Sequence, residues 1–470
     1  PQALLKRLER RLPLLAGGPR TLPARQQTMR NTIAWSHDLL SPEEQSIFRQ
    51  LAVFPGGCTI DAAEAVADPD GTFEGFGGIA SLVDKSLLRQ QEGSDDEPRF
   101  RMLETVREYG LEQLETSSEG DSTRDRLAAW CLVLAEQTEP VDFGGSMSPT
   151  WATRLDEELP NLRAAVDWLL ARGEATRALR LVVAAESFWI QRHLSDAELH
   201  RWLETTLAAA PDAPARDRAL AHWLLSYGNG VRGHDEAALF HAQRLLEAGE
   251  ELDDPSGLGF AHLALAYVWE FRGEIDRAAV AYAEVIPLWR GAKESGAWYA
   301  QAELADKRVL QGDLAAGVPM LEEALAHLRQ SDHPLDVMLV INLRGHAALL
   351  QGDLPLATRL FAESMARAMD LHNTPALLSA VAGLAGVALA YAQAVRAARL
   401  LGAVEAARES VGLKRIDNAL HVERITADTR TVLEAAEFEP AWSAGRALPL
   451  EEAVSEALTL VDEVTAGADG

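Results

Sequence analysis

The stretch Leu265-Ala-Tyr-Val-Trp-Glu-Phe-Arg-Gly-Glu-Ile-Asp-Arg-Ala278 carries the pattern that decides the fold. A mostly apolar run ends at Arg272-Gly273, and a second run opens with Glu274. Glycine readily adopts the left-handed conformation that ends a helix, and an acid near the start of the next helix is stabilised by the helix dipole. The stretch therefore predicts two helices joined by a tight turn.

The same turn recurs along the chain. Its glycines are 40, 39 and 40 residues apart, at Gly233, Gly273, Gly312 and Gly352. Small residues stand seven positions before and five positions after the turns, which lets paired helices approach closely. They are Ser226, Ala266, Ala305, Gly345 and Ala385 before, and Ala238, Ala278, Gly317, Ala357 and Ala397 after. One hairpin cannot bury its own apolar face, so the period predicts an α-solenoid, wound as a right-handed superhelix.

The front of the chain has a different pattern. Helical segments are expected at 28–40, from Ser41-Pro42 onward, at 60–67 and at 76–86, followed by short extended segments at 86–91 and 99–102 and a closing helix at 104–114. Ser41-Pro42-Glu43-Glu44 is a strong helix start, with a cap, a proline and two acids. Helices followed by a β-hairpin indicate a winged-helix-like domain, so the predicted fold class is mainly α: a winged helix and then a solenoid.

Charge argues against nucleic acid as the direct partner. The chain has a formal net charge of -27, which repels phosphate. Residues 28–115 hold 7 basic and 17 acidic residues, and Lys85 is the one base near the end of the expected reading helix. DNA binding by the winged helix itself is therefore the weaker alternative. The basic run Lys6 to Arg30 is more typical of a solvated helix face.

Other function classes find little support in the residues. No run of 18 apolar residues predicts a membrane span, and the two cysteines, Cys58 and Cys131, fit core thiols in a reducing cytoplasm. We find no catalytic constellation and no metal-ligand spacing, so no enzyme is expected. The tryptophans Trp189, Trp223, Trp269 and Trp298 are candidate walls of a ligand groove, although filling gaps between hairpins is their commoner role. Arg344 departs from the leucine that most repeats have at its position.

Several strings resemble one protein family. They are Leu22-Pro-Ala-Arg-Gln-Gln-Thr-Met-Arg-Asn-Thr-Ile-Ala-Trp-Ser-His-Asp-Leu-Leu-Ser-Pro-Glu-Glu-Gln45, Phe48-Arg-Gln-Leu-Ala-Val-Phe-Pro-Gly-Gly57, Leu82-Val-Asp-Lys-Ser-Leu-Leu88, Arg99-Phe-Arg-Met-Leu-Glu-Thr-Val-Arg-Glu-Tyr109, Glu157-Glu-Leu-Pro-Asn-Leu-Arg-Ala-Ala165 and Ala397-Ala-Arg-Leu-Leu-Gly-Ala-Val-Glu-Ala406. Together they resemble the region after the ATPase in bacterial signal-transduction ATPase (STAND) transcriptional regulators of the LuxR- or AfsR-like kind. The repeats resemble tetratricopeptide repeats.

The resemblance implies the following domains: 1–27, the end of the ATPase lid; 28–118, the winged helix; 119–160, a helical linker with a hinge loop; 161–445, the solenoid; and 446–470, a last helix and flexible tail. It also aligns Met102, Leu103 and Glu104 with a motif that senses bound ADP, although leucine cannot hydrogen-bond a phosphate.

The resemblance further implies an ATP/ADP switch in the full-length protein, with no cofactor in this fragment. No glycine precedes any of the five lysines, so the nucleotide-binding loop is expected upstream. The implied partners are a protein or small-molecule inducer on the repeats and the protein's own ATPase domain. DNA would be contacted only through another domain, and self-assembly is possible. The alternative is a stand-alone tetratricopeptide-like scaffold.

Overall fold

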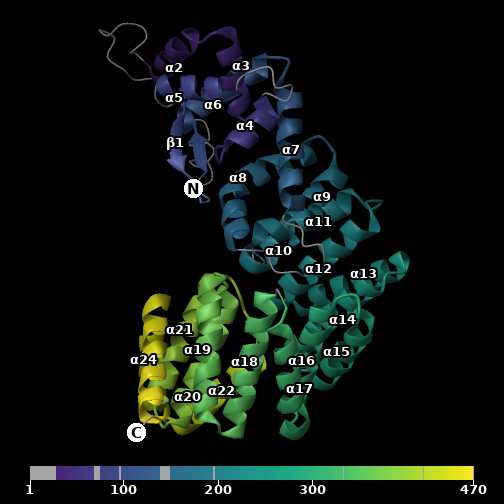
Figure 1. The fold of residues 1–470 in the computed structure, drawn as a ribbon, viewed down its shortest axis with the longest axis vertical. Coiled ribbons are helices and arrows are strands. Elements are labelled where there is room, and N and C mark those ends of the chain that lie inside the picture. The colour runs from purple at the N-terminus through teal and green to yellow at the C-terminus, as the bar shows by residue number, and fades with distance from the viewer. Residues whose placement is uncertain are drawn as a thin grey trace. The chain divides into compact units, whose positions relative to one another are not determined.

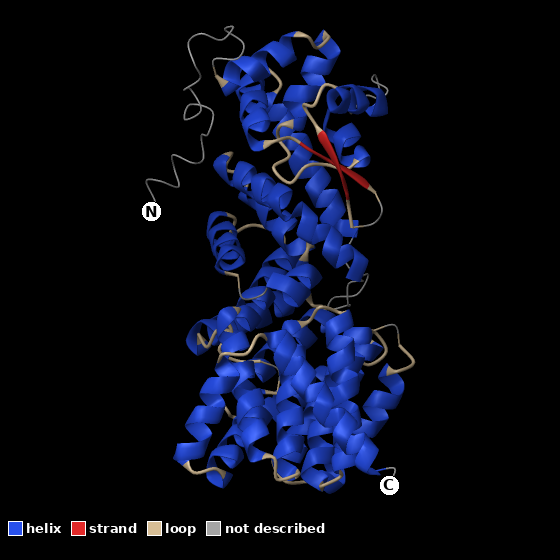
Figure 2. Cartoon of the chain, turned by 90° about the vertical axis from the view of Figure 1, so that its left-hand side faces the viewer, coloured by secondary structure: helices blue, strands red, loops and turns tan. Residues whose placement is uncertain are grey.

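The computed structural model describes residues 28–67, 75–94, 97–137, 149–193, 196–331, 333–416 and 418–468, and most of them are helical (Figures 1 and 2). The chain divides into two compact units. The winged-helix unit holds residues 1–138 and 150–185, and the repeat unit holds residues 139–149 and 186–470. The expected end of the ATPase lid, residues 1–27, lies outside the described residues.

The winged-helix domain is present as predicted. It consists of α2 (Met29–Asp38), α3 (Pro42–Leu51), α4 (Ile60–Ala67), α5 (Gly75–Asp84), β1 (Arg89–Glu92), β2 (Pro98–Arg101) and α6 (Glu104–Thr116). Ser41 and Glu44 form the capping box at the start of α3, where each side chain accepts a hydrogen bond from the other's backbone N–H. Phe48, Leu82 and Leu114 are fully buried between the helices.

The wing gains a strand partner that the sequence did not predict. β1 and β2 are antiparallel, with Gln90 opposite Phe100. On the other side of β2, Cys58 and Phe100 exchange backbone hydrogen bonds of 2.9 and 2.8 Å. Gly57 precedes this bridge with φ +77°, and an added Cβ would lie 2.6 Å from the Phe100 carbonyl oxygen. The bridge therefore requires glycine at position 57.

Three further helices belong to the winged-helix unit: α7 (Gly120–Gln137), α8 (Pro149–Ala171) and α9 (Ala175–Ala184). The boundary expected at 160/161 falls inside α8. The physical reason is that Glu158 and Asn161 of α8 are fully buried against the turn before Cys58, so α8 packs with the winged helix. Most of the expected hinge loop, 140–149, lies outside the described residues.

The repeat unit begins with α10 (Glu186–Phe188), a π-helical turn (Trp189–His193) and α11 (Ala197–Ala209). Five hairpins follow. They are α12 (Ala215–Val231) with α13 (Asp235–Leu252), α14 (Pro255–Phe271) with α15 (Ile275–Trp289), α16 (Glu294–Leu310) with α17 (Leu314–Leu328), α18 (Pro334–Gln351) with α19 (Leu354–Asp370), and α20 (Thr374–Ala390) with α21 (Ala394–Ser410). The unit ends with α22 (Ala419–Val432), α23 (Ala435–Arg446) and α24 (Leu450–Ala468).

The turn pattern is confirmed. Gly233, Gly273, Gly312 and Gly352 all have positive φ, between 72° and 90°. In the fifth hairpin, Ala392 takes the same left-handed conformation, with φ 61°. The small residues Ala266, Ala278, Ala305 and others of their kind are fully buried, as close helix packing requires.

The carboxyl end differs from the expectation in one respect. α24 continues to Ala468, so most of the segment 466–470 expected as a linker is helical. Leu460 and Val464 lie one turn apart on α24 and are both buried, which holds its second half against the unit. Among the described residues no helix is both long and apolar enough to cross a membrane.

Candidate functional site

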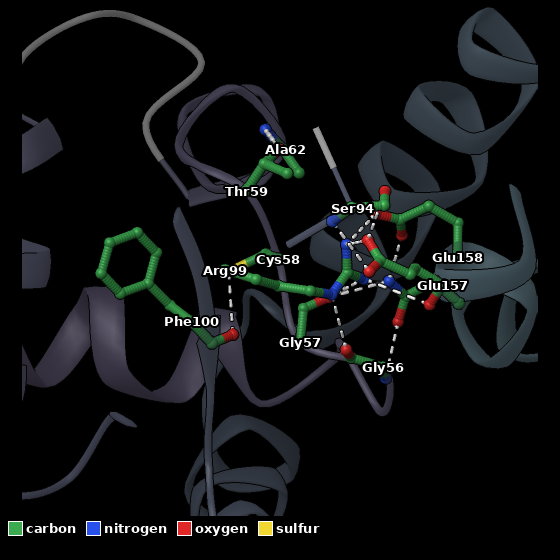
Figure 3. A network of polar contacts seen from close by, with 11 residues as sticks. Gly56, Gly57, Cys58, Thr59, Ala62, Ser94, Arg99, Phe100, Glu157 and Glu158 are labelled. Carbon is green, nitrogen blue, oxygen red and sulfur yellow. Dashed lines mark hydrogen bonds and ion pairs between the residues drawn. The ribbon is translucent and has the colours of Figure 1, made fainter. Parts of the chain in front are cut away.

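A buried polar network joins the wing of the winged-helix unit to α8 (Figure 3). The Arg99 guanidinium donates to Glu158 Oε1 at 2.6 Å, and to the carbonyl oxygens of Gly56 and Gly57 at 3.1 and 3.2 Å. Asn161 completes the network, because its Oδ1 accepts from the Gly56 N–H and its Nδ2 donates to the Gly57 carbonyl, both at 2.9 Å. Three of the sequence stretches that carry the family resemblance, 48–57, 99–109 and 157–165, therefore meet at one site in the structure.

Two bases near the expected DNA-reading face, Lys85 and Arg99, are engaged by carboxylates. Lys85, just after α5, lies 2.6 Å from Glu44 Oε1 and 2.7 Å from Oε2. The hydrogen bonds from Lys85 and Ser81 lower the pKa of Glu44 to about 2. Arg99 points into the network just described and is buried. Lys85 and Arg99 are thus held by carboxylates of the same unit, whereas Arg89 and Arg101 of the wing are exposed.

The expected nucleotide-sensing residues lie where β2 passes into α6. Leu103 is the N-cap of α6 and is 44% exposed. Glu104 forms an ion pair of 2.8 Å with Arg107, one turn along α6. Met102 is half-buried. The three residues are accessible within their unit, and their role in sensing ADP stays a prediction.

In the repeat unit, the first helices of the hairpins pack side by side, α12 on α14, α16 on α18 and α18 on α20. The described residues from Leu413 to Ile425, called here the returning segment, lie across these helices. The backbone N–H groups of Lys414 and Arg415 donate to the Val231 carbonyl at the end of α12, at 2.8 and 3.0 Å. Further along, α22 packs on α20 beside α18 (Figure 1). The returning segment therefore covers the face that the first helices share, called here the inner face.

The inner face holds a buried ion cluster. Lys307 of α16 is fully buried, and its ammonium group lies 2.8 Å from Glu270, 3.1 Å from Asp306 and 3.4 Å from Glu303. These four residues are called here the Lys307 cluster. The three surrounding carboxylates raise the pKa of Lys307 against the effect of its burial. Burying a charged group costs free energy unless it is paired. The cluster is therefore an energetically costly way to fill the space between helices.

The returning segment completes this cluster. His421 Nε2 lies 2.8 Å from Asp306 Oδ1, with both side chains about 1% exposed. The His421 ring stacks on that of His346, with 4.3 Å between the centroids. Burial and the charge of His421 lower the pKa of His346 well below its usual value. The contacts from His421 and Lys307 hold the pKa of Asp306 low despite its burial.

Beside the Lys307 cluster lies a recess with a cavity volume of about 20 Å³. Its walls come from four first helices and the returning segment: Tyr227, Tyr267, Glu270, Phe271, Tyr299, Glu303, Leu339, Leu343 and Asn418. The hydroxyls of Tyr267 and Tyr299 are hydrogen-bonded at 2.9 Å, and the rings of Tyr227 and Tyr267 stack at 5.0 Å. The recess combines aromatic walls with two carboxylates.

Among the carboxyl groups that line the recess, Glu303 is the one whose pKa is raised. Desolvation, followed by repulsion from Glu270 and Asp306, raises its pKa to about 8, although Lys307 and a hydrogen bond from Tyr299 act the other way. At neutral pH this carboxyl group is therefore mostly protonated. A carboxyl group kept neutral by burial is a common feature of binding and catalytic sites.

These residues were not predicted from the sequence, although the repeat register contains a signal for them. Six positions before the four turn glycines stand Tyr227, Tyr267, Asp306 and His346. An aliphatic core would place leucine or valine there, so aromatic and ionisable residues at one register position indicate a site. The contact between Asp306 and His421 leaves no such signal in the sequence, because it depends on where the returning segment lies in the fold.

The four tryptophans chosen from the sequence do not line the recess. Trp189 and Trp223 are buried, and Trp223 donates to Glu186 at 2.8 Å. Trp269 lies under the Arg277 guanidinium at 3.3 Å, and Trp298 stacks on His327 at 3.9 Å. Their contacts are those of side chains that pack between helices.

The comparisons with known proteins match this architecture in part. Residues 40–115 match the model of the winged helix-turn-helix domain. The chain is 34% identical over 294 residues to a Mycobacterium tuberculosis protein named "Putative HTH-type transcriptional regulator"; the match covers 59% of this chain and 32% of that protein. It is 39% identical over 129 residues to an uncharacterized protein of the same species, covering 27% and 33%. The chain thus spans about a third of these relatives' length.

Among solved structures, the chain is similar to a signal transduction ATPase with a tetratricopeptide repeat sensor from Pyrococcus horikoshii. The TM-score is 0.45 at 13% identity, with 92% of this chain and 67% of that chain covered.

Proposed function

We propose that this chain is the regulatory arm of a signal-dependent transcription regulator, with the repeat unit as the part that receives the signal. The observation that carries the proposal is the inner face, where the Lys307 cluster and the recess lie under the returning segment. Ionisable groups buried beside a recess favour binding over simple packing. The name carried by the mycobacterial relative supports a role in transcription.

The winged helix would act as a protein-contact module rather than a DNA reader. Lys85 is engaged by Glu44 and Arg99 by Glu158, and although Arg89 and Arg101 of the wing are exposed, acidic residues outnumber basic ones 17 to 7 in residues 28–115, which disfavours phosphate. The buried network around Arg99 instead makes the wing and α8 one rigid piece. Such a piece is suited to passing a change in the protein's conformation to a neighbouring domain.

The resemblance in sequence supports an ATP/ADP switch, with the ATPase and a DNA-binding domain elsewhere in a longer protein of the bacterial cytoplasm. In that proposal this segment is not catalytic and holds no cofactor of its own. Its ligand would be a protein or small-molecule inducer, and its internal partner would be the ATPase domain.

The deciding experiment is to isolate the native protein from its source and to measure its intact mass and nucleotide content. The proposal expects a polypeptide much longer than this chain that carries tightly bound ADP. A polypeptide of this size without nucleotide would overturn the switch and leave a stand-alone repeat scaffold.

Direct DNA binding is tested separately by titrating duplex DNA with the chain at low and high salt. The proposal expects no complex even at low salt, because phosphate contacts by this unit are few. A salt-sensitive complex that Lys85→Gln weakens would reverse the assignment of the winged helix.

A further inference from the structure

We propose that the recess on the inner face binds a primary ammonium group, carried either by a small amine or by a lysine side chain. This proposal deepens the proposed function. It rests on that function in one point only, namely that the bound ligand acts as the signal. It names the chemical class of the ligand that the repeat unit would take.

The lining of the recess selects for a cation. Glu270 and Glu303 supply two carboxyl groups, and the rest of the wall is formed by aromatic and aliphatic side chains with the Asn418 amide. An anionic ligand would meet two carboxyl groups at close range. A cationic group would place its charge near Glu303 and beside the aromatic wall, with any apolar stem outside the recess.

Once Glu303 ionises, the charge balance of the neighbourhood leaves room for one more positive charge. Three carboxyl groups, from Glu270, Glu303 and Asp306, surround the single ammonium group of Lys307, and His421 faces Asp306 rather than Glu303. Two further ionisable groups that face Glu303 are the hydroxyls of Tyr282 and Tyr299; burial raises the pKa of both, so they carry no charge at neutral pH. The Tyr267 hydroxyl is hydrogen-bonded to that of Tyr299.

Glu303 is therefore the group that a bound cation would ionise. Without a ligand its raised pKa, about 8, keeps it protonated at neutral pH. An incoming ammonium group would favour the carboxylate, so the Glu303 proton would leave to solvent while the ion pair forms. Binding at neutral pH would then release close to one proton for each amine bound.

The size of the recess limits the ligand further. A cavity of about 20 Å³ accepts a group the size of a water molecule. An ammonium group has that size, whereas a quaternary ammonium group does not. A water molecule alone is the competing occupant, and it would release no proton.

The test is isothermal titration calorimetry of the full chain with n-butylamine at pH 7. n-Butanol serves as the neutral match and tetramethylammonium as the oversized cation. The proposal expects binding of n-butylamine alone, and a heat that changes with the ionisation enthalpy of the buffer because a proton is released. Affinity should rise between pH 6 and pH 8, as Glu303 becomes easier to ionise. Absence of n-butylamine binding, or equal binding of n-butanol, would overturn the proposal.

The informative variant is Glu303→Gln, which keeps the size of the side chain and its neutral form. It should weaken n-butylamine binding about tenfold or more and abolish the proton release. Glu284→Gln, an exposed carboxylate on α15, is the matched control and should bind as the native chain does. Circular dichroism checks that both variants are folded. Unchanged binding by folded Glu303→Gln would refute the site.

The two sources of the ammonium group are separated by a second titration. Nα-acetyl-lysine amide stands for a lysine side chain of a partner, and its Nε-acetylated form is the neutral control. Stronger binding of Nα-acetyl-lysine amide than of n-butylamine would identify a protein partner, and the reverse would identify a small amine. Either result supports the site, and failure of both ligands overturns it.

The two proposals fail in different ways. Without amine binding, a native protein that is long and carries ADP would still be a regulator whose signal is of another class. With amine binding, a native protein of this length without nucleotide would retain the site and lose the switch.

Discussion

His421 and Asp306 are 115 residues apart in the chain, and yet the imidazole Nε2 lies 2.8 Å from the carboxylate Oδ1, with both side chains buried. This contact fastens α22 to α16 and closes the inner face. It places a helix that follows the last hairpin in contact with the third hairpin of the array.

We predict that His421→Ala lowers the free energy of unfolding by about 3–5 kcal/mol, because the buried Asp306 loses a partner. The stacking of His421 on His346 is lost as well. Urea denaturation followed by circular dichroism measures the change. His372→Ala, at an exposed histidine, is the control and should change stability by less than about 0.5 kcal/mol. Equal effects of the two substitutions would contradict this account of α22.

The contribution of Glu303 to the stability of the repeat unit should fall as pH rises from about 5 to 8, whereas His222 and His241, whose pKa values burial lowers to about 3 and 4, act the other way below about pH 6.5. Because burial raises the pKa of Glu303 from 4.5 to about 8, the folded state holds a proton that the unfolded state has released. Its contribution is complete below pH 4.5 and is lost as pH rises through 8, with a slope of at most about 1.4 kcal/mol per pH unit.

The measurement for this prediction is a series of urea denaturations between pH 5 and pH 8.5. The stability difference between the native chain and Glu303→Gln should change across this pH range, since glutamine does not titrate and the other groups are common to both. Parallel profiles for the native chain and the variant would show that Glu303 does not supply the dependence.

The Arg99–Glu158 pair should behave as a strongly coupled unit. Arg99→Met leaves Glu158 buried without its cation, and Glu158→Gln leaves Arg99 with only the longer 3.8 Å contact to Glu157, so each should cost up to about 3–5 kcal/mol. The double variant should cost at least about 1 kcal/mol less than the two single changes together. Arg89→Met, on the exposed face of β1, is the control for loss of an arginine. Strict additivity would mean that the pair contributes nothing as a pair.

Gly57→Ala should be far more damaging than Gly173→Ala. Both glycines have nearly the same positive φ, +77° and +74°, so the backbone cost of about 1–2 kcal/mol is shared. Only at Gly57 would the new Cβ also meet the Phe100 carbonyl, 2.6 Å away. Thermal unfolding of the two variants isolates that steric term. Equal melting temperatures would argue against the Cys58–Phe100 bridge.

Arg415→Gln should loosen the returning segment without unfolding the hairpins. Arg415 forms an ion pair of 2.5 Å with Asp235 at the start of α13 and donates to the Gly230 carbonyl at 3.1 Å. Hydrogen exchange should increase in α22 and stay unchanged in α16 and α17. Arg244→Gln, which removes an exposed pair with Glu247, is the control. Uniform exchange across the unit would contradict a separable segment.

Much of the fold was predictable because it is encoded locally. The turns at Gly273 and Gly312, the capping box at Ser41 and the wing hairpin each depend on residues close together in the chain. The site was less predictable. Asp306 and Lys307 look like a solvated charged pair in the sequence, and the structure buries both completely.

The sequence by itself determined the hairpins and the spacing of 39 or 40 residues between them. The reason is that glycine conformation and helical periodicity act over a few residues. The tertiary structure alone decided three other features: that Asn161 docks on Gly56 and Gly57, that the returning segment crosses the inner face, and that His421 meets Asp306. These contacts join residues more than 100 positions apart. They form only when packing brings distant segments together, and no local pattern records which buried charge will meet which partner.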